Sequence, residues 1–291
     1  MTAAAQLLVN GVALGAAYAL VALGFVLVLN ATSAVNFAQG DLVMAGGFLA
    51  VALAGPIPLP GILLLPLVAA LMAALGLLVS LLAYLPLRRR PPVSVFISTI
   101  AVGIILQNGA TLLFGPEPKA APALFGGGTL EIAGLLVPEQ SLAVVAVAGL
   151  LILGQHWLFA RTQLGRRLRA TAQDPEMARA CGIPVTAMVA FTFALGAALA
   201  GAAGLLLSNQ FFVTPTAGSG LILKAYIAVT IGGWGSVAGA VAGALLIAAF
   251  EVLVSATLSY SAATAALYLA LLAILAVRPQ GLFGEAARSR A

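Results

Sequence analysis

The chain has 291 residues, of which 63% are apolar and only 7% are charged. Soluble domains carry about 25% charged residues, so the composition excludes a soluble globular fold and indicates a membrane protein. The 13 basic and 8 acidic residues give a net charge of +5, which we interpret as loop charge that sets membrane orientation rather than as a nucleic-acid surface.

Apolar stretches long enough to span a bilayer follow one another along the whole chain. A spanning helix needs about 20 mostly apolar residues. Stretches near that length occupy residues 5–29, 35–54, 62–85, 93–114, 142–159, 185–207, 237–257 and 262–277. No basic residue precedes the first stretch, so we expect it to remain as a spanning helix rather than to be cleaved as a signal peptide. The sequence predicts one all-α, polytopic membrane domain over residues 1–291, with about eight or nine transmembrane helices.

A further apolar segment, residues 221–234, is shorter and leads into a glycine-rich break that includes Gly232, Gly233, Gly235 and Ser236. Its helix would rise only about 21 Å, less than the hydrocarbon core. We therefore expect a short broken helix near 221–236 that crosses with the help of non-helical backbone sheltered by protein. Short, glycine-interrupted spans of this kind often mark a transport path.

Basic residues predict the orientation. Eleven of the 13 lie in three groups, at residues 88–90, 161–179 and 278–290, and the positive-inside rule places all three in the cytoplasm. The segment 115–140 holds three acidic residues and one lysine, so we expect it outside. Counting crossings from residue 88 then places the N-terminus outside. The C-terminus is cytoplasmic if 221–234 crosses.

Motifs for catalysis are missing from the sequence. No glycine is followed by lysine, so the phosphate-binding loop of ATPases is absent. One cysteine, Cys181, and one histidine, His156, exclude an internal disulfide and a cysteine–histidine metal cluster. We expect no enzyme activity and no catalytic, cofactor-binding or metal-binding residue in this chain.

Two carboxylates lie within apolar stretches. Glu251 falls about two-thirds of the way along 237–257, where an unpaired charge is costly, so it should face protein or a water-filled cavity. It is either a pathway residue or a hydrogen-bond anchor between helices. Asp41 follows Asn36 and Gln39 near the start of a helix, where Asn36 can act as the N-cap and Asp41 can offset the helix dipole. Alternatively, this polar helix start lines the transport path, which makes Asn36, Gln39, Asp41 and Glu251 the pathway candidates.

Glycines recur at a spacing of four residues. Gly235, Gly239 and Gly243 should share one helix face, as should Gly11 and Gly15. Small residues at this spacing let helices approach closely inside a membrane. The pattern predicts helix packing, and it is also compatible with a helix that lines a channel or a subunit interface.

The hydrophilic loop 161–184 contains signals for a short helix. Asp174 can cap a helix over 175–181, and Gly182 ends it ahead of Pro184. Such a helix, anchored between two spans, can transmit force as a rigid unit. The alternative is a solvated basic loop whose charge only sets orientation.

Several motifs together resemble one family, the smaller (LivH-like) permease subunit of ATP-binding-cassette importers for branched-chain amino acids. They run in the family's order across nearly the whole chain: Gly15-Ala-Ala-Tyr18-Ala19-Leu20, Asn36-Phe-Ala-Gln39-Gly-Asp41, Asp174-x-x-Met177-Ala178-x-x-x-Gly182-Ile183, Gly232-Gly233-x-Gly235-Ser236-x-x-Gly239-Ala240 and Arg278-Pro-Gln-Gly-Leu-Phe-Gly284. Trp234 is bulkier than the small or aliphatic residue expected at that position.

The resemblance implies a permease that forms half of a translocation pathway in the bacterial inner membrane. Its partners would be a second related permease, two cytosolic ATPase subunits and a periplasmic or lipid-anchored binding protein. ATP would be bound by those subunits, and Asp174, Met177, Ala178, Gly182 and Ile183 would form the loop that couples to them. The alternatives are a permease for urea or short amides and, from another class, an ion-coupled secondary carrier of amino acids.

Overall fold

The computed structural model describes residues 2–56, 60–125, 128–132, 135–277 and 281. Within them, seven helices are long and apolar enough to cross a membrane, and two apolar helices are shorter. The long ones are α1 (Thr2–Thr32), α3 (Gly61–Val79, continued to Leu87 by a π turn and a 3-10 turn), α4 (Pro92–Phe114), α5 (Glu139–Arg161), α8 (Val185–Phe211), α10 (Val237–Thr257) and α11 (Tyr260–Val277). The short ones are α2 (Gln39–Ala54) and α9 (Ala217–Gly232). This confirms the prediction of an all-α, polytopic membrane protein.

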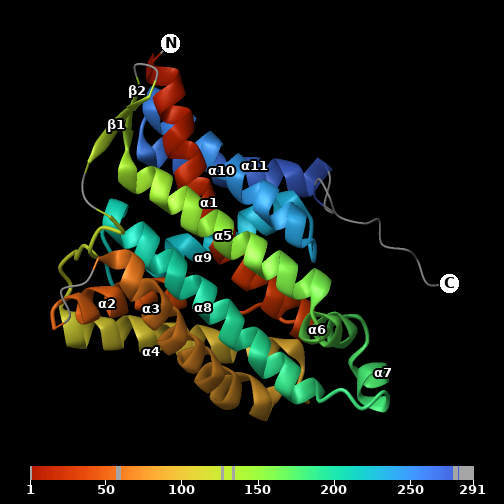
Figure 1. Cartoon of the computed structure of the whole chain (residues 1–291). Helices are drawn as coiled ribbons and strands as arrows, with labels where there is room; N and C mark the ends of the chain where they lie inside the picture. The colour runs from red at the N-terminus through yellow and green to blue at the C-terminus, as the bar shows by residue number, and fades with distance from the viewer. Residues whose placement is uncertain (1, 57–59, 126–127, 133–134, 278–280, 282–291) are drawn as a thin grey trace.

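Two ends of the helix bundle are distinguished by what lies there (Figure 1). At one end, here called the hairpin end, β1 (Thr129–Ile132) pairs antiparallel with β2 (Leu135–Pro138) just before α5 begins. At the other, here called the basic end, α5 finishes at Arg161, followed by α6 (Gln163–Gln173) and α7 (Pro175–Ala180). The hairpin was not predicted from the sequence. It occupies the segment 115–140, which was expected to leave the membrane.

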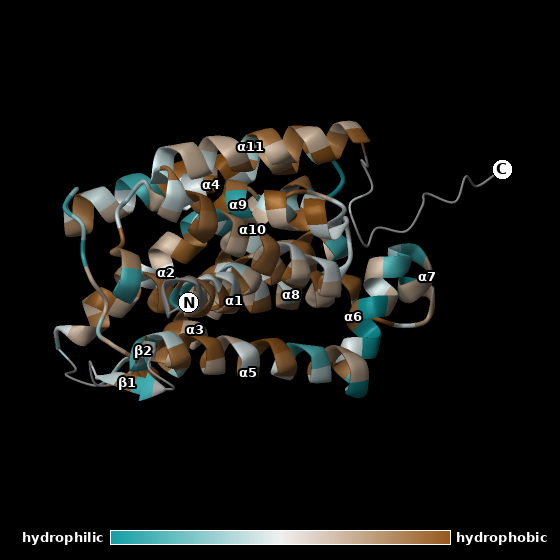
Figure 2. Cartoon of the chain, turned by 90° about the horizontal axis from the view of Figure 1, so that it is seen from above, coloured by the Kyte–Doolittle hydropathy of each residue, from teal (hydrophilic) through white to brown (hydrophobic). Residues whose placement is uncertain are grey.

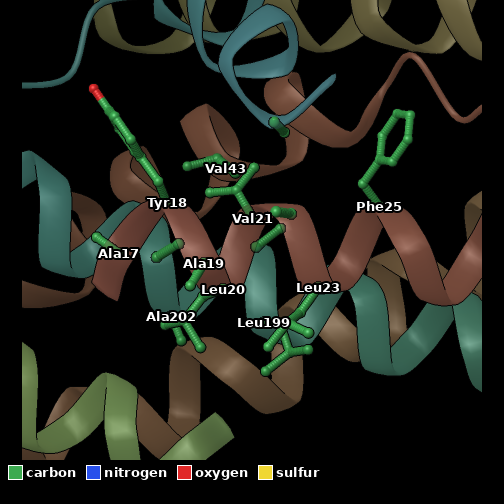
Figure 3. Close-up of a cluster of buried hydrophobic side chains, with 14 of the residues drawn as sticks. Ala17, Tyr18, Ala19, Leu20, Val21, Leu23, Phe25, Val43, Leu199 and Ala202 are labelled. Atoms are coloured by element: carbon green, nitrogen blue, oxygen red, sulfur yellow. The ribbon is translucent and has the colours of Figure 1, made fainter. Parts of the chain in front are cut away.

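α1 is the central helix of the bundle (Figure 2). It packs against α5, α8, α9 and α10, and from Ala13 to Val28 it is almost entirely buried. A helix that is apolar on every face can be buried on every face. Figure 3 shows the result: Leu20 and Leu23 point toward Leu199 and Ala202 of α8, whereas Val21 points the opposite way, toward Val43 of α2.

The short helices begin halfway through the bundle instead of at its ends. Asp41, in the first turn of α2, lies against Gly103 in the middle of α4 and against Gly218 in the first turn of α9. Gly40 in turn approaches the backbone of Gly218 and Ile222. The N-termini of α2 and α9 therefore meet in the interior. Non-helical backbone at 33–38 and 212–216 reaches them, as expected where protein shelters open peptide groups.

The two short helices leave this meeting point in opposite directions. α2 runs toward the hairpin end, where Gly47 lies against Ser208 and Val213, and α9 runs toward the basic end, where Gly232 packs against Gly239. Each follows a long helix, α1 or α8, and precedes another, α3 or α10. Moreover, α1 packs along α10 as α8 packs along α3. Two three-helix units thus repeat one arrangement with inverted direction, a repeat that we could not recognise in the sequence.

The path of the backbone confirms that the segment containing residues 221–234 passes from one end of the bundle to the other. α8 ends near the hairpin end, and residues 212–232 return the chain to the basic end. The helix in this segment, α9, begins at Ala217, four residues earlier than predicted. Gly281 lies against Thr230 and Gly233, so the chain also comes back to the basic end after α11. The arginines of the third basic group, at 278–290, lie outside the described residues.

Candidate functional site

A buried ion pair joins α9 to α10. The Nζ atom of Lys224 lies 2.6 Å from Oε1 of Glu251, and the two residues are 9% and 3% exposed. A charge in the interior of a membrane protein is tolerated when it is paired and hydrogen-bonded. Glu251 therefore lies inside the bundle with a cationic partner.

Two tyrosines complete the hydrogen bonding of this pair. Lys224 Nζ donates to the hydroxyls of Tyr18, at 2.7 Å, and Tyr260, at 3.3 Å, so that all three of its N–H groups have acceptors. The Tyr18 hydroxyl donates to Oε2 of Glu251 at 3.2 Å. Both rings also lie beside the ammonium, with their centroids 5.0 and 5.4 Å from Nζ, a separation at which a cation is attracted to an aromatic ring.

Four helices converge on this cluster of Tyr18, Lys224, Glu251 and Tyr260. Tyr18 lies on α1, and Figure 3 shows its hydroxyl directed away from the apolar contact between α1 and α8. Two adjoining pockets of about 580 and 480 Å³ open beside the cluster and share Glu251 and Tyr260 in their walls. The second of these also contains Pro138 of β2, so the cluster is approached from the hairpin end.

The other pathway candidates form a second polar cluster, around the start of α2. Asp41 Oδ1 accepts a hydrogen bond from Gln107 Nε2 of α4 at 2.8 Å. Gln39 Nε2 donates to the carbonyl of Gly196 at 3.1 Å, whereas Gln39 Oε1 and Asn36 Nδ2 are buried with no hydrogen-bond partner among the residues that the structure describes. The candidates therefore lie in two places: Asn36, Gln39 and Asp41 come together, and Glu251 lies in the other cluster.

One part of the predicted helix start is wrong. α2 begins at Gln39, and Ala38 rather than Asn36 occupies its N-cap position. Asn36 Oδ1 instead accepts from the backbone N–H of Ala38 at 3.1 Å, which stabilises a turn before the helix. Asp41 does lie in the first turn of α2, as predicted.

The glycine face of α10 is real but does not include Gly235. Gly239 packs on the Gly232 carbonyl and Gly243 on the Ala228 carbonyl, both in α9, and a side chain at either position would overlap that backbone. Gly235 precedes the helix and adopts a positive φ of 82° in the turn that follows Gly233, whose φ is 104°. It therefore cannot share a helix face with the other two. Ser236 Oγ accepts from Gly239 N and caps α10, so the break between α9 and α10 occurs at Gly233–Ser236. Gly11 and Gly15 share one face of α1, as predicted, and the structure shows that this face packs against α10.

At the basic end, the short helix in the loop 161–184 forms as predicted. Asp174 Oδ1 accepts from the backbone N–H groups of Glu176 and Met177, which caps α7. Gly182 follows with a φ of 78°, a conformation that favours glycine. α6 and α7 project from the bundle (Figure 1), with Met177 exposed and Ala178 buried against the fold. Ile183 is half-buried, where the chain turns into α8.

Sequence reasoning missed four members of these clusters as site residues, namely Tyr18, Lys224, Tyr260 and Gln107. Lys224 carried the clearest signal, because it is the only charged residue in its apolar segment and must be paired there. No such signal marked Tyr260 or Gln107. Among the described residues no group of three or more His, Cys, Asp or Glu side chains could hold a metal ion.

Comparisons with known proteins agree with the motifs found in the sequence. The family described as branched-chain amino acid transport system / permease component matches residues 7–277. The chain is 33% identical to the high-affinity branched-chain amino acid transport system permease protein LivH of Escherichia coli (strain K12), over 96% of this chain and 95% of that protein. It is 32% identical to the permease protein BraD of the corresponding system of Pseudomonas aeruginosa, over the same shares of the two chains.

A more distant relative comes from an archaeon. The probable branched-chain amino acid transport permease protein LivH of Methanocaldococcus jannaschii is 28% identical over 91% of this chain and 88% of that protein. The matches extend over nearly the full length of both partners and include the helices that carry both polar clusters. The chain therefore belongs to the branched-chain amino acid permease family of ATP-binding-cassette transporters, and it is a membrane transport subunit rather than an enzyme.

Proposed function

We propose that this chain is the permease subunit of an importer for branched-chain or similar hydrophobic amino acids in the bacterial inner membrane. The family match over residues 7–277 carries the proposal. The bundle also suits a small zwitterion with an apolar side chain, because its interior is apolar apart from a few polar groups. A path of that kind binds the solute weakly enough to release it.

The proposal includes the partners that the family implies. The chain forms half of the translocation pathway beside a second, related permease, and a periplasmic or lipid-anchored protein delivers the solute. Two cytosolic ATPase subunits bind ATP, so this chain needs no cofactor of its own. The basic residues of the loop 161–184 support placing the basic end in the cytoplasm. Because α1 begins at the hairpin end, the N-terminus is then outside, and the C-terminus is cytoplasmic.

Coupling to the ATPases is assigned to the protruding helix α7. It is rigidly capped by Asp174, exposes Met177, and is joined to the spanning helix α8 by Gly182 and Ile183. A movement of α7 is therefore passed directly to α8, which packs on α1, α2 and α3. The arginines of α6 and α7 flank the surface that would meet an ATPase.

Uptake by the assembled transporter tests the proposal. Cells without their own branched-chain amino acid uptake would express this chain with its partner subunits, and the entry of labelled leucine, isoleucine and valine would be measured. We expect uptake that disappears when the ATPase subunits are withheld. Leucine uptake without ATPases would instead favour an ion-coupled carrier. Uptake of urea or acetamide but not of leucine would favour the amide permease.

A further inference from the structure

The ion pair of Lys224 and Glu251 lines a pocket whose other walls are largely apolar. This pocket of about 580 Å³ lies where α1, the end of α8, the start of α9 and the start of α11 meet. Its apolar lining includes Leu14, Leu207, Phe211 and Leu221. Sites for small molecules commonly combine such an apolar lining with a few charged groups that fix orientation.

Each charge of the pair has a hydrogen bond that a ligand can replace. The longest bond from Lys224 Nζ, 3.3 Å, goes to the hydroxyl of Tyr260, whose side chain is largely exposed at the start of α11. On Glu251, Oε2 is contacted by the Tyr18 hydroxyl at 3.2 Å, and a carboxylate oxygen can accept a second bond. A ligand carboxylate can therefore take the place of Tyr260 on Nζ while a ligand ammonium approaches Oε2.

The two charges together select the kind of ligand. A ligand with a single charge would bond to one member of the pair and weaken that member's bond to the other, which leaves a buried charge poorly compensated. A zwitterion brings both charges, so each member gains a partner while the net charge of the site stays zero. We propose that this pocket binds the zwitterionic group of an amino acid, with Lys224 on the carboxylate, Glu251 on the ammonium and the apolar wall around the side chain.

The inference rests on the proposed function, because it takes the transported amino acid as the ligand. It also predicts weak binding, since the ligand competes with a pair that is already bonded. Weak binding is what a transport path requires. The competing explanation is that the pair only braces α9 against α10, in which case an uncharged pair of similar size would serve equally well.

Photolabelling of the purified transporter distinguishes the two explanations. The probe is photo-leucine, a leucine analogue with a diazirine in its side chain, applied to the assembled complex without its binding protein. We expect adducts on the apolar wall, at Leu14, Phe211 or Leu221. Excess leucine should compete, whereas leucinamide, which lacks the carboxylate, and 4-methylpentanoate, which lacks the amine, should not.

The decisive variant removes both charges together, as Lys224→Met with Glu251→Gln, so that no unpaired charge is left buried. The matched control is Thr257→Val on α10, the helix of Glu251, because Thr257 is exposed and its hydroxyl bonds to carbonyls of its own helix. We expect the double variant to assemble but to lose roughly tenfold or more of both labelling and leucine uptake, the effect of a lost charge-assisted hydrogen bond. The control should match the wild type.

Two results would overturn the inference: adducts away from this pocket, or undiminished labelling in the double variant. Failure of the proposed function is a separate observation, the absence of branched-chain amino acid uptake by the wild-type complex. Labelling is scored whether or not uptake occurs, so the two failures are distinguishable. If the double variant does not assemble, Lys224→Arg, which keeps the positive charge, is tested in its place. If leucinamide displaces the label from this variant as well as leucine does, Lys224 does not bind the carboxylate of the ligand.

Discussion

Replacing one member of the Lys224–Glu251 pair should destabilise the transporter more than replacing both members. Glu251→Gln keeps the size of the side chain and an oxygen that can accept a hydrogen bond, so it looks like a mild change. However, the Lys224 ammonium, which lies 2.6 Å from the substituted carboxylate oxygen, then keeps only uncharged hydrogen-bond partners. Lys224→Met leaves the carboxylate in the same position. Each single change should cost about 3–5 kcal/mol, as is usual when one partner of a buried pair is removed.

The double variant Lys224→Met/Glu251→Gln should be less damaging than either single variant. No buried charge remains, and the introduced amide can still accept from the Tyr18 hydroxyl. We expect a residual cost of about 1 kcal/mol, the contribution of a lost neutral hydrogen bond. The assay is the temperature at which half of the assembled complex survives heating in detergent, read by size-exclusion chromatography. We expect this temperature to be highest for the wild type, lower for the double variant and lowest for the two single variants.

That order is diagnostic, because two independent destabilising changes would add. If the melting temperature of the double variant falls by the sum of the two decreases seen in the single variants, charge compensation is not the reason for the pair. Single variants that melt like the wild type would show that one of the two groups is neutral in the protein, and the ion pair would then have no energetic role.

Three further predictions follow from the other features. Gly239→Leu should reduce the yield of assembled complex because its side chain would overlap the Gly232 carbonyl of α9, whereas Val241→Leu, on another face of α10, should not. Equal yields of the two variants would contradict the close packing. Gly182→Trp should leave the membrane domain folded but uncouple ATP hydrolysis from leucine uptake, whereas Gly182→Asn should retain coupling because asparagine tolerates the positive φ. Full uptake in the Trp variant would exclude α7 as the coupling element. Asp41→Leu should lose more uptake than Asp41→Asn, because only the amide can still accept from Gln107, and an unpaired donor there costs about 1 kcal/mol. Equal uptake by the two variants would place Asp41 outside the mechanism.

Features governed by neighbouring residues were predictable from the sequence. Runs of apolar residues located the spanning segments, since a bilayer core requires about 20 of them in succession. The cap at Asp174, the stop at Gly182 and the break after Gly232 were also predictable, because capping and positive φ depend on residues within one turn. The exclusion of Gly235 from the α10 face shows the limit of such spacing rules: four residues mean one helix face only where the helix has already begun.

Contacts between distant segments became visible only in the tertiary structure. The sequence indicated that Glu251 needs a polar partner, but its partners Tyr18 and Lys224 lie 233 and 27 residues away, and no local pattern links the three. The inverted arrangement of α1–α2–α3 and α8–α9–α10 was equally hidden, because a fully buried apolar helix accepts many apolar sequences and its two copies need not resemble each other. Hydrophobicity places a helix in the membrane, whereas its neighbours depend on close packing of small residues and on the requirement that a buried charge find its counter-charge.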